Sequence, residues 1–144
     1  MIVDFYQLSV TPLERVLPRI CERLLETGER LLIVAAPEQL DRLDQLLWTY
    51  KADSFLPHAK ADADAPERQP ILLAPESSAA NVARNIALAD GQWREEALQF
   101  DRTFYFFDKE GAEAARQAWR QLGGRDGVER RYWRQENGKW VQGP

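Results

Sequence analysis

The chain has 144 residues with 44% hydrophobic and 29% charged content, and its formal net charge at pH 7 is -4. These values are typical of one soluble globular domain, and no stretch approaches the ~20 apolar residues that a membrane helix needs. The single cysteine, Cys21, excludes an internal disulfide, and with only one histidine a Cys/His zinc cluster is excluded as well. The first residues lack the basic and apolar segments of an export signal, so we expect a cytoplasmic protein without a membrane partner.

The first segment of the chain predicts a strand followed by a helix. Residues 2–8 are rich in β-forming side chains, and Thr11-Pro12-Leu13-Glu14 then has the pattern of a helix start, with proline at the first helical position. Apolar side chains recur at helical spacing from Leu13 to Leu24, and Gly28 is placed to end this helix.

A buried strand, a second helix and a polar loop are expected next. The continuous apolar run over 31–36 predicts a central strand that is covered on both faces. Pro37 opens a helix with acidic residues in its first turn and leucines along one face, and we expect this helix to end between 48 and 51. Residues 51–69 are polar, rich in alanine and interrupted by proline, which indicates an exposed loop.

The second half of the chain predicts further short strands, a helix and a hairpin. Strands are expected over 70–74, 85–89 and 103–107, with a short helix-like piece over 93–100. A helix is expected over 111–122, and the β-rich segment over 128–141 contains Asn137-Gly138 as a possible hairpin turn. Strands that alternate with helices predict a single α/β domain over residues 1–144, with a mainly parallel central sheet flanked by helices.

Nucleotide sites in α/β domains lie at the carboxyl ends of strands, but their sequence signatures are absent from this chain. Neither a Gly-x-Gly-x-x-Gly turn after a strand nor a Gly-x-x-x-x-Gly-Lys-Ser/Thr loop occurs, so we expect no phosphate loop, no cofactor and no metal. Cys21 lies beside the apolar stripe of the first helix and is interpreted as a small buried hydrophobe. A small α/β enzyme that acts on a nucleotide, with active groups such as Asp90 or Asp108, is the alternative to a non-catalytic domain.

Large aromatic side chains mark the end of the second helix and the segment that follows it. Trp48 is followed by Ser54-Phe55-Leu56-Pro57-His58. Core aromatics usually belong to regular elements, whereas aromatics in the exit from a helix are more often partly exposed, and exposed aromatic patches mark binding surfaces. An arrangement in which both rings fold back over the core is equally compatible with the sequence.

A basic and aromatic cluster lies on the helix predicted over 111–122. Arg116 and Arg120 are four residues apart and share a face, which Trp119 adjoins. Guanidinium groups bind carboxylates and an aromatic ring accommodates an apolar side chain, so this cluster suits an acidic peptide that ends in a hydrophobic residue. Two alternatives stay open: the arginines are simply solvated above a buried alanine stripe, or the basic last third of the chain binds nucleic acid directly.

Five motifs, taken in order, resemble those of one protein family. They are Asp4-Phe5-Tyr6, Gly28-Glu29-Arg30-Leu31-Leu32-Ile33, Leu43-Asp44-x-x-Leu47-Trp48, Ser54-Phe55-Leu56-Pro57-His58 and Ala115-Arg116-x-x-Trp119-Arg120. Together they cover nearly the whole chain, and they resemble the chi subunit of the bacterial DNA polymerase III clamp-loader assembly. The block from Leu47-Trp48 to Pro57-His58 is the most specific part of this resemblance.

The resemblance implies a non-catalytic replisome adaptor whose α/β fold has a nucleotide-binding-like topology without a phosphate loop. It further implies that Trp48, Phe55 and Pro57 bind the psi subunit of the clamp loader in a one-to-one heterodimer. Psi in turn reaches the clamp-loader ATPases, which would place the chain in the cytoplasm of a bacterium as part of the replisome.

A second surface is implied by the same resemblance. Arg116, Trp119 and Arg120 would receive the acidic C-terminal tail of single-stranded-DNA-binding protein, with Tyr105 beside Trp119 against the terminal phenylalanine of that tail. The chain would then reach DNA only indirectly. Well-studied relatives carry a tyrosine where this chain has Trp119 and a lysine where it has Ala112, so one basic contact is absent and the pocket is reshaped.

Overall fold

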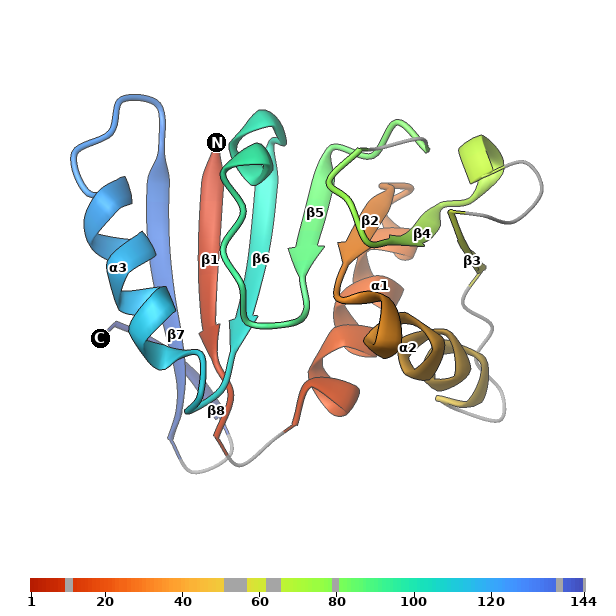
Figure 1. Ribbon diagram of the computed structural model, residues 1–144, viewed down its shortest axis with the longest axis horizontal. Helices are drawn as coiled ribbons and strands as arrows, with labels where there is room; N and C mark the ends of the chain where they lie inside the picture. Colours follow the sequence, from red (N-terminus) through yellow and green to blue (C-terminus); the bar gives the residue numbers. More distant parts are fainter. Residues whose placement is uncertain (10–11, 51–56, 62–65, 79–80, 137–138, 144) are drawn as a thin grey trace.

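The strands assemble into one sheet in a computed structural model that describes residues 1–9, 12–50, 57–61, 66–78, 81–136 and 139–143 (Figure 1). Within these residues the sheet has eight strands in the order β3-β4-β2-β5-β6-β1-β7-β8. The strands are β1 (Ile2–Gln7), β2 (Leu31–Val34), β3 (His58–Lys60), β4 (Ile71–Ala74), β5 (Asn85–Leu88), β6 (Arg102–Phe107), β7 (Glu129–Glu136) and β8 (Lys139–Gln142). All neighbouring strands run parallel except β7 and β8. The predicted α/β class and its mainly parallel sheet are confirmed.

Helices cover both faces of the sheet, as parallel strands require, because each parallel connection must cross over the sheet. The helices are α1 (Leu13–Glu26), α2 (Pro37–Thr49) and α3 (Ala112–Leu122), with short 3-10 helices η1 (Pro66–Arg68) and η2 (Glu95–Gln99). The apolar stripes of α1 and α2 pack with β2, β4, β5 and β6 on one face, and α3 packs on the other. Figure 1 shows α2 and α3 near opposite ends of the sheet.

The burial of the central strands on both faces explains why their positions could be predicted from the sequence. Every residue of β2, β4 and β5 is buried, because these strands have helices on one face and further apolar side chains on the other. A strand covered on both faces needs a continuous apolar run rather than an alternating one. By contrast, β7 lies near the edge of the sheet and none of its eight residues is buried.

One local prediction differs from the structure. The short strand β3 lies within the segment expected to be a loop, because pairing with β4 at the sheet edge satisfies its backbone although it has no apolar run. The short helix-like piece expected over 93–100 is confirmed as a 3-10 helix over Glu95–Gln99. The antiparallel ending is confirmed, with Glu136 opposite Lys139, while the predicted turn residues Asn137-Gly138 lie outside the described part of the chain.

A buried carboxylate joins the three strands β6, β1 and β7. Asp4 is fully buried, and its two oxygens accept hydrogen bonds from Arg102 Nε at 2.9 Å, Arg131 Nε at 2.7 Å and Trp133 Nε1 at 2.9 Å. Burial alone raises the pKa of Asp4, but the hydrogen bonds from Arg131, Trp133 and Arg102 outweigh it and hold that pKa below its ordinary value. The carboxylate therefore stays charged although it is shielded from water.

Candidate functional site

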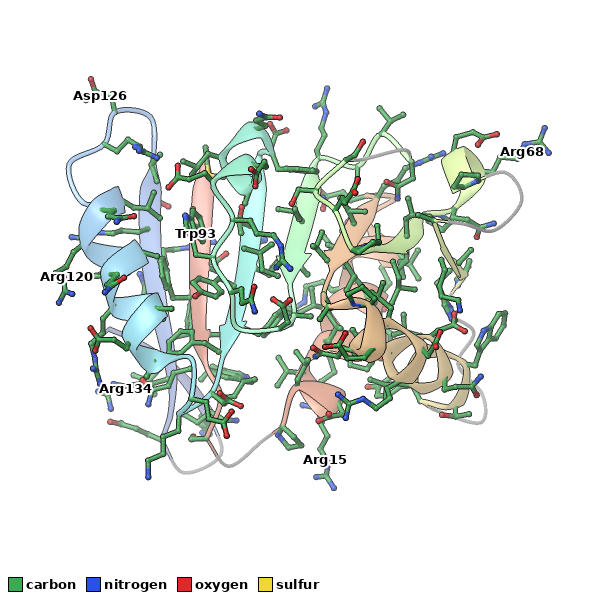
Figure 2. The ribbon with its side chains drawn as sticks, viewed as in Figure 1. Arg15, Arg68, Trp93, Arg120, Asp126 and Arg134 are labelled. Atoms are coloured by element: carbon green, nitrogen blue, oxygen red, sulfur yellow. The ribbon has the colours of Figure 1, made fainter. Side chains whose placement is uncertain are left out.

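The pattern of α3 decides which of its side chains reach the surface. Ala115, Ala118 and Leu122 are buried against the sheet, and they recur at three- and four-residue spacing along one stripe. Arg116 and Arg120 therefore lie on the outer side, and Figure 2 shows Arg120 projecting from α3 away from the sheet. The side chain of Trp119 lies at the boundary and is half-buried.

Trp119 forms one wall of a surface pocket of about 290 Å³ between α3 and the sheet. The pocket is lined by Gln7, Arg116, Trp119, Arg120 and Tyr132. Trp119 and Tyr132 meet edge to face, with their ring centroids 5.6 Å apart. The Tyr132 hydroxyl donates a hydrogen bond to Gln7 Oε1, which fixes the tyrosine ring against β1. Two rings at right angles with two guanidinium groups beside them form a site for a flat apolar group that carries negative charge.

The rings of Trp119 and Tyr132 pack against further residues of the sheet. Phe5, fully buried on β1, contacts Trp119 edge to face at 5.2 Å and lies parallel to Tyr132 at 6.4 Å. The Arg130 guanidinium carbon lies 4.1 Å from the centre of the Trp119 ring, and Arg130 donates a hydrogen bond to the Trp119 carbonyl. Trp119 is therefore fixed before any ligand arrives, which lowers the entropic cost of binding.

The two pocket arginines share one acidic neighbour on their own helix. Arg116 Nη1 donates to Glu113 Oε2 at 3.0 Å, and Arg120 Nη2 lies 4.0 Å from Glu113 Oε1. All three side chains are about two-thirds exposed, at 65% for Arg116, 66% for Arg120 and 67% for Glu113. Exposed ion pairs contribute only ~0.2–1 kcal/mol, so an incoming carboxylate can displace Glu113 at little cost.

A second hollow of about 480 Å³ continues from this pocket toward the start of α3. Gln7, Arg116 and Tyr132 line both hollows. Ala112 and Lys109 also line the second hollow. The two hollows together provide room for several residues of an extended peptide.

Tyr105 does not belong to this pocket, which corrects its expected position beside Trp119. It is fully buried in β6, and its hydroxyl donates a hydrogen bond of 2.9 Å to the carbonyl of Gly91. Its ring packs against Phe5 and Trp93 within the core, and burial raises its pKa to about 12. The reason is that β6 is covered on both faces, so neither parity of its side chains reaches solvent.

Tyr132 takes the place that was expected for Tyr105, and sequence reasoning missed it. The local sequence Arg130-Arg131-Tyr132-Trp133 in β7 has two basic residues followed by two aromatic residues, which does not indicate which side chains face α3. Parallel pairing with β1 decides this, because it places Tyr132 opposite Phe5 and on the same face of the sheet.

The predicted aromatic surface lies at the opposite edge of the sheet. Trp48, near the end of α2, is 50% exposed, and its ring centroid lies 4.5 Å from that of His58. His58 is buried, with Nε2 3.1 Å from the carbonyl oxygen of Asp44, and Pro57 beside it is half-buried. Trp48 therefore does not fold into the core. Phe55 lies outside the described residues.

Asp90 and Asp108, the candidates of the enzyme alternative, follow the carboxyl ends of β5 and β6. Asp90 is bound by Arg94 at 2.8 Å, and Asp108 Oδ1 accepts hydrogen bonds from the backbone amides of Glu110 and Gly111. Both candidates of the enzyme alternative thus have local structural partners. Among the described residues no group of three or more histidine, cysteine or acidic side chains is arranged to hold a metal ion, and none of the helices has the length and apolar content that a bilayer crossing requires.

The chain matches the model of a known protein family. The family model of the DNA polymerase III chi subunit, HolC, matches residues 1–128. This match includes Trp48 and Pro57 at one edge of the sheet and the whole of α3 at the other, whereas Tyr132 lies beyond it. No curated protein matches the chain.

Proposed function

The chain belongs to the DNA polymerase III chi subunit family, a family of non-catalytic accessory subunits of that polymerase, and on this premise we propose that it connects the holoenzyme to single-stranded-DNA-binding protein. In this proposal it is a bacterial, cytoplasmic replisome subunit with two separate protein-binding surfaces. The observation that carries the proposal is the pocket at α3, where two exposed arginines flank a pre-formed pair of aromatic rings.

The tail of single-stranded-DNA-binding protein fits the chemistry of this pocket. Its terminal phenylalanine would lie against the exposed surfaces of Trp119 and Tyr132, and its terminal carboxylate would replace Glu113 as the partner of Arg116 and Arg120. The acidic residues that precede the phenylalanine would extend over the adjoining hollow toward Lys109. Tyr132 replaces Tyr105 in this assignment because Tyr105 is buried.

The psi subunit would bind at the other edge of the sheet, around Trp48, Phe55 and Pro57. Exposed large apolar side chains are rare in the described part of the chain, where Trp48 and Val82 are the two examples. The strand order supports simultaneous binding of both partners, since β3 next to Trp48 and β7 next to α3 are separated by five strands of the sheet. A one-to-one complex with psi would therefore leave the α3 pocket open.

The tail pocket is tested by titrating a labelled acidic peptide that ends in Asp-Pro-Phe against wild type and the variants Arg116→Ala, Arg120→Ala and Trp119→Ala. Pairs of a carboxylate with exposed arginines contribute about 0.2–1 kcal/mol, so each arginine variant is expected to weaken binding by up to about fivefold. The matched control is Arg68→Ala, because Arg68 is exposed at the other end of the molecule (Figure 2). The pocket is wrong if all three variants bind like wild type while circular dichroism shows them folded.

Two further measurements separate the parts of the proposal. A peptide with an amidated C-terminus should bind more weakly, because it offers no terminal carboxylate to the arginines. For the psi surface, Trp48→Ala should prevent co-purification with psi and leave peptide binding intact, whereas Val82→Ala, at the other exposed apolar side chain, should change neither. Retention of psi by Trp48→Ala would contradict the aromatic surface.

A further inference from the structure

A third surface lies between α1 and the β1-β7-β8 end of the sheet, on the face opposite to α3. The apolar stripe of α1 packs over β2, β5 and β6, and the side chains of β7 on this face remain half-exposed. A hollow of about 190 Å³ lies there, lined on one side by Arg15, Arg19 and Arg23 of α1 and on the other by Tyr6 and Trp140. Neither proposed protein-binding surface uses any of these residues.

The three helix arginines form a regular positive row. They are four residues apart, so they lie along one side of α1 at intervals of about 6 Å and span about 12 Å. All three are exposed, and within the described residues no carboxylate forms an ion pair with them. Arg102 and Arg131 add two more guanidinium groups on the same face of the sheet. Both pair with the buried carboxylate of Asp4, so the three side chains together carry one net positive charge.

A half-exposed aromatic shelf runs beside this row. Trp133 lies parallel to Tyr6 with ring centroids 6.3 Å apart, and Trp140 of β8 meets Tyr6 edge to face at 5.3 Å. The Trp133 indole nitrogen donates to Asp4, so its orientation is fixed by the buried carboxylate. The shelf therefore offers ring surfaces beside the arginines, and Tyr6 and Trp140 line the same hollow as the arginine row.

We infer that this surface binds single-stranded nucleic acid, with phosphates along Arg15, Arg19 and Arg23 and bases against the rings of Trp133 and Trp140. Single-strand sites combine a positive track for the backbone with aromatic platforms for the bases, and both parts are present here. A row of separate charges beside separate rings fits a ligand that repeats charge and flat rings along its length. The pocket at α3 differs, because its two arginines converge on one ring pair and suit a single chain end. This surface adds a direct DNA contact to the adaptor role, in which DNA is reached only through another protein.

The inference is tested by fluorescence anisotropy with a labelled oligothymidine of about 15 nucleotides, near the upper end of single-domain site sizes. The variant combines Arg15→Glu, Arg19→Glu and Arg23→Glu. The control combines Arg42→Glu, Arg68→Glu and Arg84→Glu, which are exposed elsewhere and change the net charge equally. Wild type should bind with an affinity that falls with salt, and loss of three phosphate contacts should reduce the slope of log K against log salt by about 2. The control should retain the wild-type slope.

Two further variants locate the site. Trp140→Ala should weaken oligothymidine binding by at least about fivefold through lost stacking, while Arg116→Glu with Arg120→Glu should leave it unchanged. If the control triple variant loses as much oligothymidine affinity as the α1 variant, net charge alone explains the loss and the inference is overturned. Tighter, competing binding of a polyglutamate peptide to the same arginines would overturn it in favour of an acidic protein partner, as would an absence of any salt-dependent oligothymidine binding.

Discussion

Replacing Asp4 by asparagine is expected to destabilise the fold by about 2–3 kcal/mol at pH 7. Removing one partner from a buried ion pair typically costs about 3–5 kcal/mol, because the remaining charge stays buried without compensation. Here the side chains of Arg102 and Arg131 keep 36% and 27% exposure and can take up water, which places the expected loss below that range. At about 2–4 °C per kcal/mol for a chain of this size, the melting temperature should fall by roughly 5–10 °C.

The pH dependence gives the sharper test. The pKa of Asp4 in the folded protein lies below its ordinary value of 3.8, so the stability that its charge contributes is present above pH 3.8 and is lost as the pH falls through the folded pKa. The stability difference between wild type and Asp4→Asn should therefore be constant near neutral pH and shrink only below about pH 4.

Urea unfolding, followed by tryptophan fluorescence at a series of pH values, measures this difference. The matched control is Asp101→Asn, because Asp101 is 71% exposed and lies 3.9 Å from an arginine that is itself 84% exposed, so little change is expected. A loss below about 0.5 kcal/mol for Asp4→Asn, or a loss that persists undiminished at pH 2, would refute the role given to the buried carboxylate.

Three further outcomes are expected. Glu113→Gln should strengthen binding of the acidic peptide about twofold, since it frees Arg116 and Arg120 from a weak exposed pair, and unchanged or weaker binding by calorimetry would contradict the competition. The Cys21 thiol, which is buried and has its pKa raised to about 12 by that burial, should not react with a thiol reagent at pH 8 until urea unfolds the chain. Tyr105→Phe should cost about 0.5–1.5 kcal/mol of stability by removing its hydrogen bond to Gly91, and peptide affinity should not change, whereas a clear loss of affinity would return Tyr105 to the pocket.

Local sequence patterns determined most of the secondary structure and part of the candidate site. The apolar run over 31–36 predicted β2 because a strand covered on both faces excludes polar side chains along its whole length. The spacing of Ala115, Ala118 and Leu122 likewise decided that Arg116 and Arg120 lie on the outer side of α3. These features depend on residues within a few positions of each other, so the sequence alone contains the signal.

Contacts between distant residues were decided only by the tertiary structure. Tyr132 lines the pocket and Tyr105 does not, although both lie opposite Phe5, because the strand order places β7 beside α3 and β6 further inside the sheet. The hydrogen-bond donors to Asp4 lie 98 to 129 residues away in the sequence, and no local pattern predicts that they cluster around it. The arginines of α1 lie beside Tyr6 and Trp140 because the crossover from β1 to β2 places α1 over this face of the sheet, which no local pattern indicates. Side-chain periodicity reports which face of an element is buried, but the neighbours on that face follow from strand order and register, which sequence periodicity does not contain.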